Sequence, residues 1–183
     1  RRRRRTPRAD PSAMPRAVPI RAAVTVIVDD QGWSKLVGDP MPLLRRAARA
    51  AVKVARRPRG LKPGGVAALS VALMSDRGVR RLNRDFRGKD QPTNVLSFPS
   101  DSRAGGPGRR VELGDIALAL GVVRREAKAQ GKAAADHLAH LMVHGVLHLL
   151  GYDHENAEDA ARMERLERKA LAALGIADPY VIG

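Results

Sequence analysis

The sequence predicts a single α+β domain. Segments with β-branched runs alternate along the chain with segments whose apolar residues recur at helical period, and the connections between them are short. A chain of 183 residues with 44% hydrophobic side chains can bury one sizeable core rather than two. No internal repeat interrupts this order.

The first half of the chain predicts the order strand, helix, strand, helix. Residues 22–28 form a β-branched run, which indicates a strand. Residues 40–57 begin with Pro-Met-Pro and then place apolar and basic residues at helical period, which predicts a helix. Residues 66–74 predict a second strand. Asp76 is the expected N-cap of a short helix that ends near residue 85.

The second half predicts two more strands and three more helices. Arg87 and Gly88 indicate a turn that leads into a third strand at residues 94–98. Residues 101–110 are rich in glycine and arginine and predict a mobile loop. The remaining elements are a strand at residues 116–120 and helices at about residues 122–130, 133–150 and 157–174, the first closed by Gly131 and the last by Gly175.

Three of the five histidines lie close together, in the run His144-Gly-Val-Leu-His148-Leu-Leu-Gly151-Tyr-Asp-His154. Residues four apart project from one helix face, so His144 and His148 can both bind one ion at about 2.0 to 2.1 Å. Gly151 can adopt the left-handed conformation that ends a helix, which lets His154 return as a third ligand. Three protein ligands leave one position open, as in catalytic zinc sites. This spacing favours a metal site over three histidines that pack separately.

The residue after the first histidine argues against a peptidase. In zinc peptidases with a His-Glu-x-x-His motif, that glutamate accepts a proton from the attacking water. Here the position is Gly145, which cannot act as a base. No other general base stands out, because Asp153 and Glu155 are close to the histidines only in sequence.

Further motifs carry a family resemblance. They are Arg87-Gly-Lys-Asp, then Pro92-Thr-Asn-Val-Leu-Ser-Phe-Pro, and then Leu113-Gly-Asp-Ile, each in order before the histidine run. Together with that run, these motifs resemble the YbeY family of bacterial and organellar metal-dependent endoribonucleases, over about residues 22–181. The resemblance implies a small, mostly mixed sheet of four strands packed with about five helices, including a zincin-like metal helix.

The resemblance also implies an activity and its partners. It implies a zinc-dependent, single-strand-specific endoribonuclease that matures the 3′ end of small-subunit ribosomal RNA and takes part in ribosome quality control. The expected partners are ribosomal RNA and the small ribosomal subunit, together with ribosomal proteins or an assembly GTPase. Two alternatives stay open: a metallopeptidase or other hydrolase on the same scaffold, and a ribosome assembly factor whose metal only stabilises the fold.

The expected site residues follow from the motifs. His144, His148 and His154 would hold one Zn²⁺ ion per chain, although three imidazoles suit nickel or copper comparably. His144 is also expected to be catalytic. Arg87 matches the arginine implicated in catalysis in the family, and its planar fork can hold two phosphate oxygens as negative charge develops. Lys89 is a second candidate for substrate binding.

Other polar residues near these motifs are expected to support the site. His140 and Asp153 are candidates for contacts behind the metal ligands. His137 and His140 share the helix face of His144 and are expected mainly to form local hydrogen bonds. Asp115 is expected to hold the sheet edge in place, and Asn94 and Ser97 to support the site through backbone bonds.

The net charge of +15 indicates an anionic partner. Residues 1–21 hold eight arginines, one aspartate and four prolines, which predicts a disordered tail. This tail is a nucleic-acid arm, the remnant of a transit peptide, or sequence upstream of the true start. Positive residues also concentrate at 45–59, 77–89 and 103–110, which favours binding to a polyanion. With one Trp, two Tyr and two Phe, base stacking on single strands is not indicated.

Composition also bears on location. The chain has no cysteine, which excludes disulfides and thiolate ligands and fits a reducing compartment. No apolar stretch reaches the roughly 20 residues that a membrane helix needs. We therefore expect a cytoplasmic protein that does not bind membranes, with an organellar location left open by the arginine-rich N-terminus.

Overall fold

The computed structural model describes residues 18–55, 61–101 and 110–181. In these ranges, four strands form one mixed sheet in the order β1-β2-β4-β3. Strands β1, β2 and β4 run parallel to one another, and β3 pairs antiparallel with β4 at one edge. The strands are β1 (Arg21–Val28), β2 (Val66–Met74), β3 (Val95–Pro99) and β4 (Arg110–Ala119). The predicted α+β fold with a small mixed sheet is confirmed.

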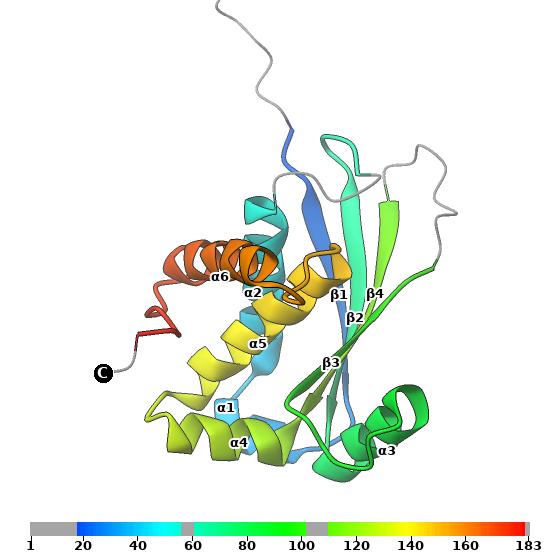
Figure 1. Cartoon of the computed structure of the whole chain (residues 1–183), viewed down its shortest axis with the longest axis vertical. Coiled ribbons are helices and arrows are strands. Elements are labelled where there is room, and N and C mark those ends of the chain that lie inside the picture. The colour runs from blue at the N-terminus through cyan, green and yellow to red at the C-terminus, as the bar shows by residue number, and fades with distance from the viewer. Residues whose placement is uncertain (1–17, 56–60, 102–109, 182–183) are drawn as a thin grey trace, which may run out of the picture.

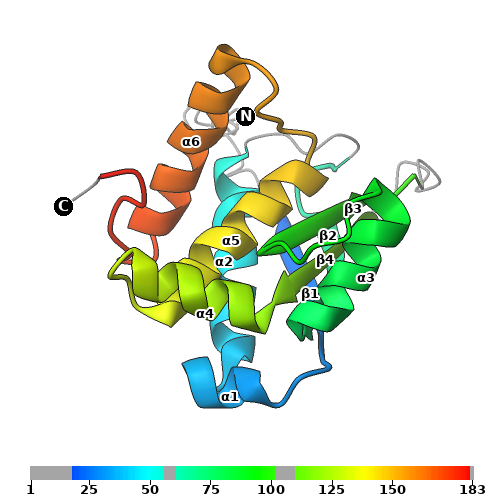
Figure 2. The same ribbon diagram turned by 60° about the horizontal axis from the view of Figure 1, so that its bottom comes forward.

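Six helices accompany the sheet in the described residues, one more than predicted. They are α1 (Gly32–Val37), α2 (Pro40–Val54), α3 (Asp76–Arg87), α4 (Leu120–Ala129), α5 (Ala134–Leu149) and α6 (Ala157–Ala172). Helices α2, α5 and α6 lie on one side of the sheet, and α3 lies on the other (Figures 1 and 2). The additional helix, α1, has only six residues, so its helical period is too short to recognise, although its Trp33 is fully buried.

Two apolar clusters hold the layers together. The main core lies between the helices and the inner face of the sheet, where residues such as Leu44 of α2, Met142 of α5 and Ile116 of β4 are almost fully buried. The second, smaller cluster lies on the outer face, where Val79 of α3 packs against Leu96 of β3. Because successive strand residues point to opposite faces, β4 contributes to both clusters.

Helix α5 lies close to the sheet at Gly145. A Cβ atom at this position would lie 3.0 Å from Ile116 Cδ1 and 3.2 Å from Ser97 Oγ. Such contacts are tighter than most real ones, so a larger residue here would push Ile116 or Ser97 aside by a few tenths of an ångström, and glycine allows the helix to approach the sheet without this shift. The close approach places the C-terminal half of α5, with its histidines, beside the edge strand β3.

Several predicted boundaries were wrong. Strand β4 begins at Arg110 rather than near residue 116, because its first residues already pair with β2. The N-cap of α3 is Ser75, while Asp76 accepts hydrogen bonds from the Gly121 and Val122 amides and so caps α4. Arg87 is the last residue of α3 rather than part of a turn into the next strand.

Other predictions fall partly outside the described residues. The structure describes residues 18–21 of the predicted tail, and β1 begins at Arg21, but residues 1–17 lie outside the described ranges. Residues 102–109 of the predicted loop are also outside them. Among the described residues, no helix has the length and apolar character that crossing a membrane requires.

Candidate metal centre

The three predicted ligands come together at the C-terminal end of α5. Nitrogen atoms of His144, His148 and His154 all lie within 4.8 Å of one another. The Nε2 atoms of His144 and His148 are 3.0 Å apart. Two nitrogens bound to one tetrahedral zinc ion at about 2.0 to 2.1 Å would lie about 3.3 Å apart. The pair His144 and His148 is already near this spacing, and nitrogens that lie up to 4.8 Å apart would have to approach each other by at most about 1.5 Å to share one ion.

The loop after α5 returns His154 to the site. Gly151 has a φ of 88°, the left-handed conformation predicted for this position. The Tyr152 amide then donates to Leu147 O at 3.0 Å, and the Tyr152 hydroxyl donates to Ala55 O of the segment after α2 at 2.8 Å. These bonds tie the loop both to its own helix and to a neighbouring element.

Burial keeps the central histidine neutral. It lowers the pKa of the His148 imidazole to about 4, and the neighbouring His144 and His154 add to this effect. A neutral imidazole is the form that binds a metal, so no proton needs to be displaced from His148 near neutral pH.

A buried carboxylate lies directly behind the first ligand. Glu167 of α6 is 1% exposed, and its Oε1 accepts a hydrogen bond from His144 Nδ1 at 2.7 Å. Since a carboxylate can only accept, the proton of this bond is on Nδ1, and His144 Nε2 is free to face the other ligands. The Glu167 Oε2 atom accepts from His140 Nε2 at 2.9 Å and from the Tyr180 hydroxyl.

These hydrogen bonds keep Glu167 ionised. Burial alone would raise the pKa of the Glu167 carboxyl, but the hydrogen bonds from His140, His144 and Tyr180 outweigh burial and lower this pKa to about 2. Burial and the nearby carboxylate also raise the pKa of Tyr180, so its hydroxyl stays a donor. The site therefore holds a permanent negative charge against the back of a metal ligand.

Glu167 and Tyr180 were missed in the sequence. Charged residues are common along α6, and most of them are exposed, as expected for a solvated helix face. One signal was available: Glu167 falls four residues after Met163 and three before Ala170, so it occupies a buried position in the helical period of α6. A carboxylate at such a position requires a partner.

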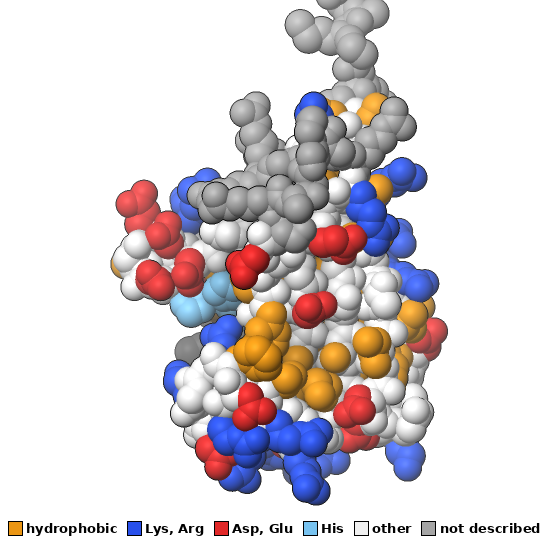
Figure 3. Space-filling model, turned by 90° about the vertical axis from the view of Figure 1, so that its right-hand side faces the viewer, with side chains coloured by type: hydrophobic (Ala, Val, Ile, Leu, Met, Phe, Trp, Pro, Cys, Tyr) orange, Lys and Arg blue, Asp and Glu red, His pale blue; other side chains and the backbone are white. Residues whose placement is uncertain are grey.

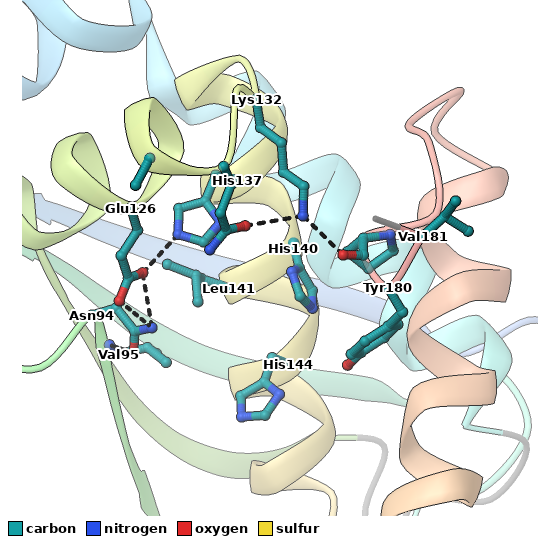
Figure 4. Close-up of a pocket in the computed structure, with 13 residues that line it drawn as sticks. Asn94, Val95, Glu126, Lys132, His137, His140, Leu141, His144, Tyr180 and Val181 are labelled. Carbon is teal, nitrogen blue, oxygen red and sulfur yellow. Dashed lines mark hydrogen bonds and ion pairs between the residues drawn. The ribbon is translucent and has the colours of Figure 1, made fainter. Parts of the chain in front are cut away.

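The other histidines of α5 each contact a carboxylate. His140 contacts Glu167, which supports the expectation that it lies behind the ligands. His137 Nε2 lies 2.8 Å from Glu126 of α4, which also accepts hydrogen bonds from the Asn94 amide. Burial lowers the pKa of His137. Asn94, Glu126, His137 and His140 line a pocket of about 830 Å³ that reaches from α4 to His144 and Tyr180 (Figure 4).

Asp153 supports the ligand loop rather than an imidazole. Its Oδ1 accepts a hydrogen bond from the backbone amide of His154 at 2.7 Å, which fixes the backbone of the third ligand. The predicted contact behind the ligands is therefore made through the main chain.

Arg87 lies across β3 from the metal helix. Its Nη2 donates to Ser97 O at 3.2 Å, while the Ser97 hydroxyl donates to Gly145 O at 3.4 Å. Two hydrogen bonds thus connect Arg87 to the residue that follows His144. Lys89 is exposed, and its ammonium group makes no hydrogen bond or ion pair with any described residue.

Asp115 does not have the supporting role expected of it. Its side chain is exposed on β4 and makes no hydrogen bond or ion pair within the described part of the chain. The sheet edge is instead held by the antiparallel ladder between β3 and β4.

Comparisons with known proteins agree with these features. The family model for "Endoribonuclease YbeY" matches residues 39–175. Endoribonuclease YbeY of Alkalilimnicola ehrlichii is 60% identical over 116 residues, which cover 63% of this chain and 70% of the relative. Endoribonuclease YbeY of Rhodospirillum rubrum is 49% identical over 172 residues, which cover 91% of this chain and 84% of the relative.

A third relative covers most of both chains. Endoribonuclease YbeY of Maricaulis maris is 49% identical over 158 residues, which cover 86% of this chain and 91% of the relative. Among solved structures, the solution structure of TM1509 from Thermotoga maritima aligns with a TM-score of 0.48 and 22% identity, over 87% of this chain and 99% of the other. The matches in sequence confirm the resemblance, and the chain belongs to the endoribonuclease YbeY family.

Proposed function

We propose that this chain is a metal-dependent endoribonuclease that cleaves single-stranded ribosomal RNA, with one zinc ion held by His144, His148 and His154. The observation that carries this proposal is the convergence of three imidazoles, one of them backed by a buried carboxylate, in a member of an endoribonuclease family. We further propose that the reaction matures the 3′ end of small-subunit ribosomal RNA and serves ribosome quality control. Its partners would then be the small subunit and ribosomal proteins or an assembly GTPase.

The residues around the metal ligands fix the tautomer and the orientation of His144. A bound zinc ion would supply Lewis acidity toward a phosphate oxygen or an attacking water. Glu167 holds the proton of His144 on Nδ1, so that Nε2 is the nitrogen presented to the ion. His140 and Tyr180 donate to the second oxygen of Glu167 and prevent this carboxylate from rotating away.

Arg87 is suited to hold the phosphate that is cleaved. It uses one hydrogen bond of the guanidinium to anchor itself at Ser97, and its remaining N–H groups make no other hydrogen bond to a described residue. A guanidinium can offer two parallel donors to a phosphodiester, and these donors become more valuable as charge develops on the phosphate oxygens. Lys89, two residues later, adds a second cation for the RNA backbone.

The structure gives a second reason to disfavour a peptidase. The position of the missing glutamate, Gly145, is packed against Ile116 and Ser97 of the sheet. A side chain there would enter the contact between α5 and the sheet. A glutamate at this position would therefore have to displace side chains of the sheet, and the base itself is missing.

The proposal is tested by metal analysis and RNA cleavage on the same preparation. We expect about one bound transition metal ion per chain, cleavage of a single-stranded RNA, and loss of cleavage on chelation that is reversed by Zn²⁺. Casein should remain intact under the same conditions. Metal-loaded protein that cleaves casein but not RNA would support the peptidase, and loss of the fold on chelation with no RNA cleavage before it would support the assembly factor.

A further inference from the structure

The outer face of the sheet has an exposed aromatic pair. Phe86, in the last turn of α3, is 69% exposed, and its ring lies 5.3 Å from that of Phe98 on β3 in an edge-to-face arrangement. These two residues are all the phenylalanines of the chain. Helix α3 buries Leu96, two residues earlier on β3, but leaves Phe98 partly open. Because the two rings adjoin one another, they form an exposed apolar patch rather than a single exposed side chain, and such patches often mark binding sites.

A carboxylate with no partner among the described residues borders the same surface. Asp115 of β4 lies directly opposite Phe98 in the antiparallel pair, so both side chains project from the outer face. Phe86, Phe98 and Asp115 line one groove of about 340 Å³, whose remaining walls are apolar or backbone. Asp115 forms no hydrogen bond or ion pair with the described residues, so its oxygens are available to a ligand.

The groove adjoins the candidate active site. Arg87 follows Phe86 directly, and its guanidinium is bound to the carbonyl of Ser97, the residue before Phe98. Histidine side chains, a Lys or Arg side chain and a hydrophobic patch follow one another across one face of the molecule (Figure 3). A strand of RNA that leaves the metal centre past Arg87 would therefore reach this groove next.

The charge around the groove favours a nucleic acid over a protein segment. Six exposed cations lie on α3 and in the segment after it. Two of them, Arg80 and Arg84, pair with carboxylates. The other four make no ion pair with any described acidic group: Arg77, Arg81, Arg87 and Lys89. Single-stranded RNA is bound by aromatic rings that stack on its bases, by acceptors for the N–H groups of the bases and by cations that contact its phosphates.

We propose that Phe86, Phe98 and Asp115 form a nucleobase site for a nucleotide that flanks the cleaved phosphate, an inference that rests on the proposed endoribonuclease function. The base stacks on Phe86, and Asp115 accepts a hydrogen bond from an exocyclic amino group of cytosine or adenine. Base stacking was not indicated by the low aromatic content of the sequence, but here the fold brings both phenylalanines to one place.

The first test replaces Phe86 with alanine. The matched control is Ile27→Ala, because Ile27 is 58% exposed but lies on β1 at the opposite edge of the sheet. For the zinc-loaded protein and a short single-stranded oligoribonucleotide, we expect Phe86→Ala to raise KM by about 5- to 100-fold, with kcat largely retained. Ile27→Ala should leave both constants unchanged. Phe86 is exposed, so both variants should keep the melting temperature of the wild type.

An abasic nucleotide moved stepwise along the oligoribonucleotide locates the site. In the wild type, the missing base should raise KM at one position next to the cleaved phosphate. In Phe86→Ala, the same abasic substrate should not raise KM any further, because the ring that the base contacts is already absent. If the effects of Phe86→Ala and of the abasic nucleotide on KM were additive at every position, the stacking contact would be overturned.

The acceptor is tested by base preference. Wild type should prefer cytosine over uracil at that position by about tenfold, and Asp115→Ala should lose this preference, since uracil has no exocyclic amino group to donate. A ratio is used because removal of a negative charge raises affinity for any RNA. If wild type and Ile27→Ala cleave RNA and Phe86→Ala behaves like them, the nucleobase site is overturned while the proposed function stands. If wild type cleaves no RNA, the proposed function fails and this site fails with it.

Discussion

Replacing Glu167 with glutamine should weaken metal binding without touching a ligand. The carboxylate accepts three hydrogen bonds, from His144 Nδ1 at 2.7 Å, from His140 Nε2 at 2.9 Å and from the Tyr180 hydroxyl. Glutamine has nearly the same shape, but one end of its amide donates instead of accepting. At least one of the three bonds must therefore be lost or reversed.

The size of the effect depends on which end of the amide faces His144. If the NH₂ group faces Nδ1, the imidazole proton moves to Nε2, the nitrogen that the ion needs. If the carbonyl faces Nδ1, the bond survives but loses its charge, and Nε2 becomes a weaker base. Changes of this kind behind a metal ligand reduce affinity by about 10- to 100-fold, or roughly 1.4 to 2.7 kcal/mol.

The assay is competition for Zn²⁺ with a chelator of known affinity, on folded protein at a temperature well below the melting transition. Glu164→Gln is the matched control, because Glu164 is on the same helix, is 38% exposed and, among the residues that the structure describes, pairs only with Arg168. Exposed pairs of this kind contribute about 0 to 1 kcal/mol to stability, so this control should bind zinc like the wild type. A folded Glu167→Gln variant with wild-type zinc affinity would refute the role assigned to Glu167.

Two further predictions concern other parts of the site. Arg87→Lys should lower kcat for RNA cleavage by roughly 10- to 100-fold with KM nearly unchanged, because lysine keeps the charge but loses the paired donors; steady-state kinetics would contradict this if KM rose while kcat did not change. Gly145→Glu should lower the free energy of unfolding by about 3 kcal/mol or more, since its Cβ would already lie 3.0 Å from Ile116. Chemical denaturation measures this loss, and a stable variant that hydrolyses casein would show the packing argument to be wrong.

The metal ligands could be predicted because their geometry is local. His144 and His148 are one helical turn apart, and Gly151, three residues after His148, reverses the chain so that His154 reaches the same site. The short run from His144 to His154 therefore contains the whole arrangement. The carboxylate behind His144 is 23 residues away, on a helix whose position depends on tertiary packing. Only the buried position of Glu167 in its helical period pointed to it.

The remaining differences have similar causes. Arg87 was expected in a turn because Gly88 follows it, but that glycine is the left-handed C-cap of α3, with a φ of 66°. Strand β4 was predicted too short because Gly114 interrupts its apolar pattern, although Arg110 to Leu113 alternate between charged and apolar residues and pair with β2. Phe86 and Phe98 come from a helix and a strand, and no periodicity within either element relates them.

The central claim is that three histidines hold an ion on which RNA cleavage depends. It is tested most directly by measuring bound metal and RNA cleavage together in the wild type and in His148→Ala. The account predicts about one ion per chain in the wild type, well below one in the variant, and loss of cleavage in proportion to the lost metal. Full metal occupancy in His148→Ala, or undiminished cleavage by metal-free protein, would contradict it.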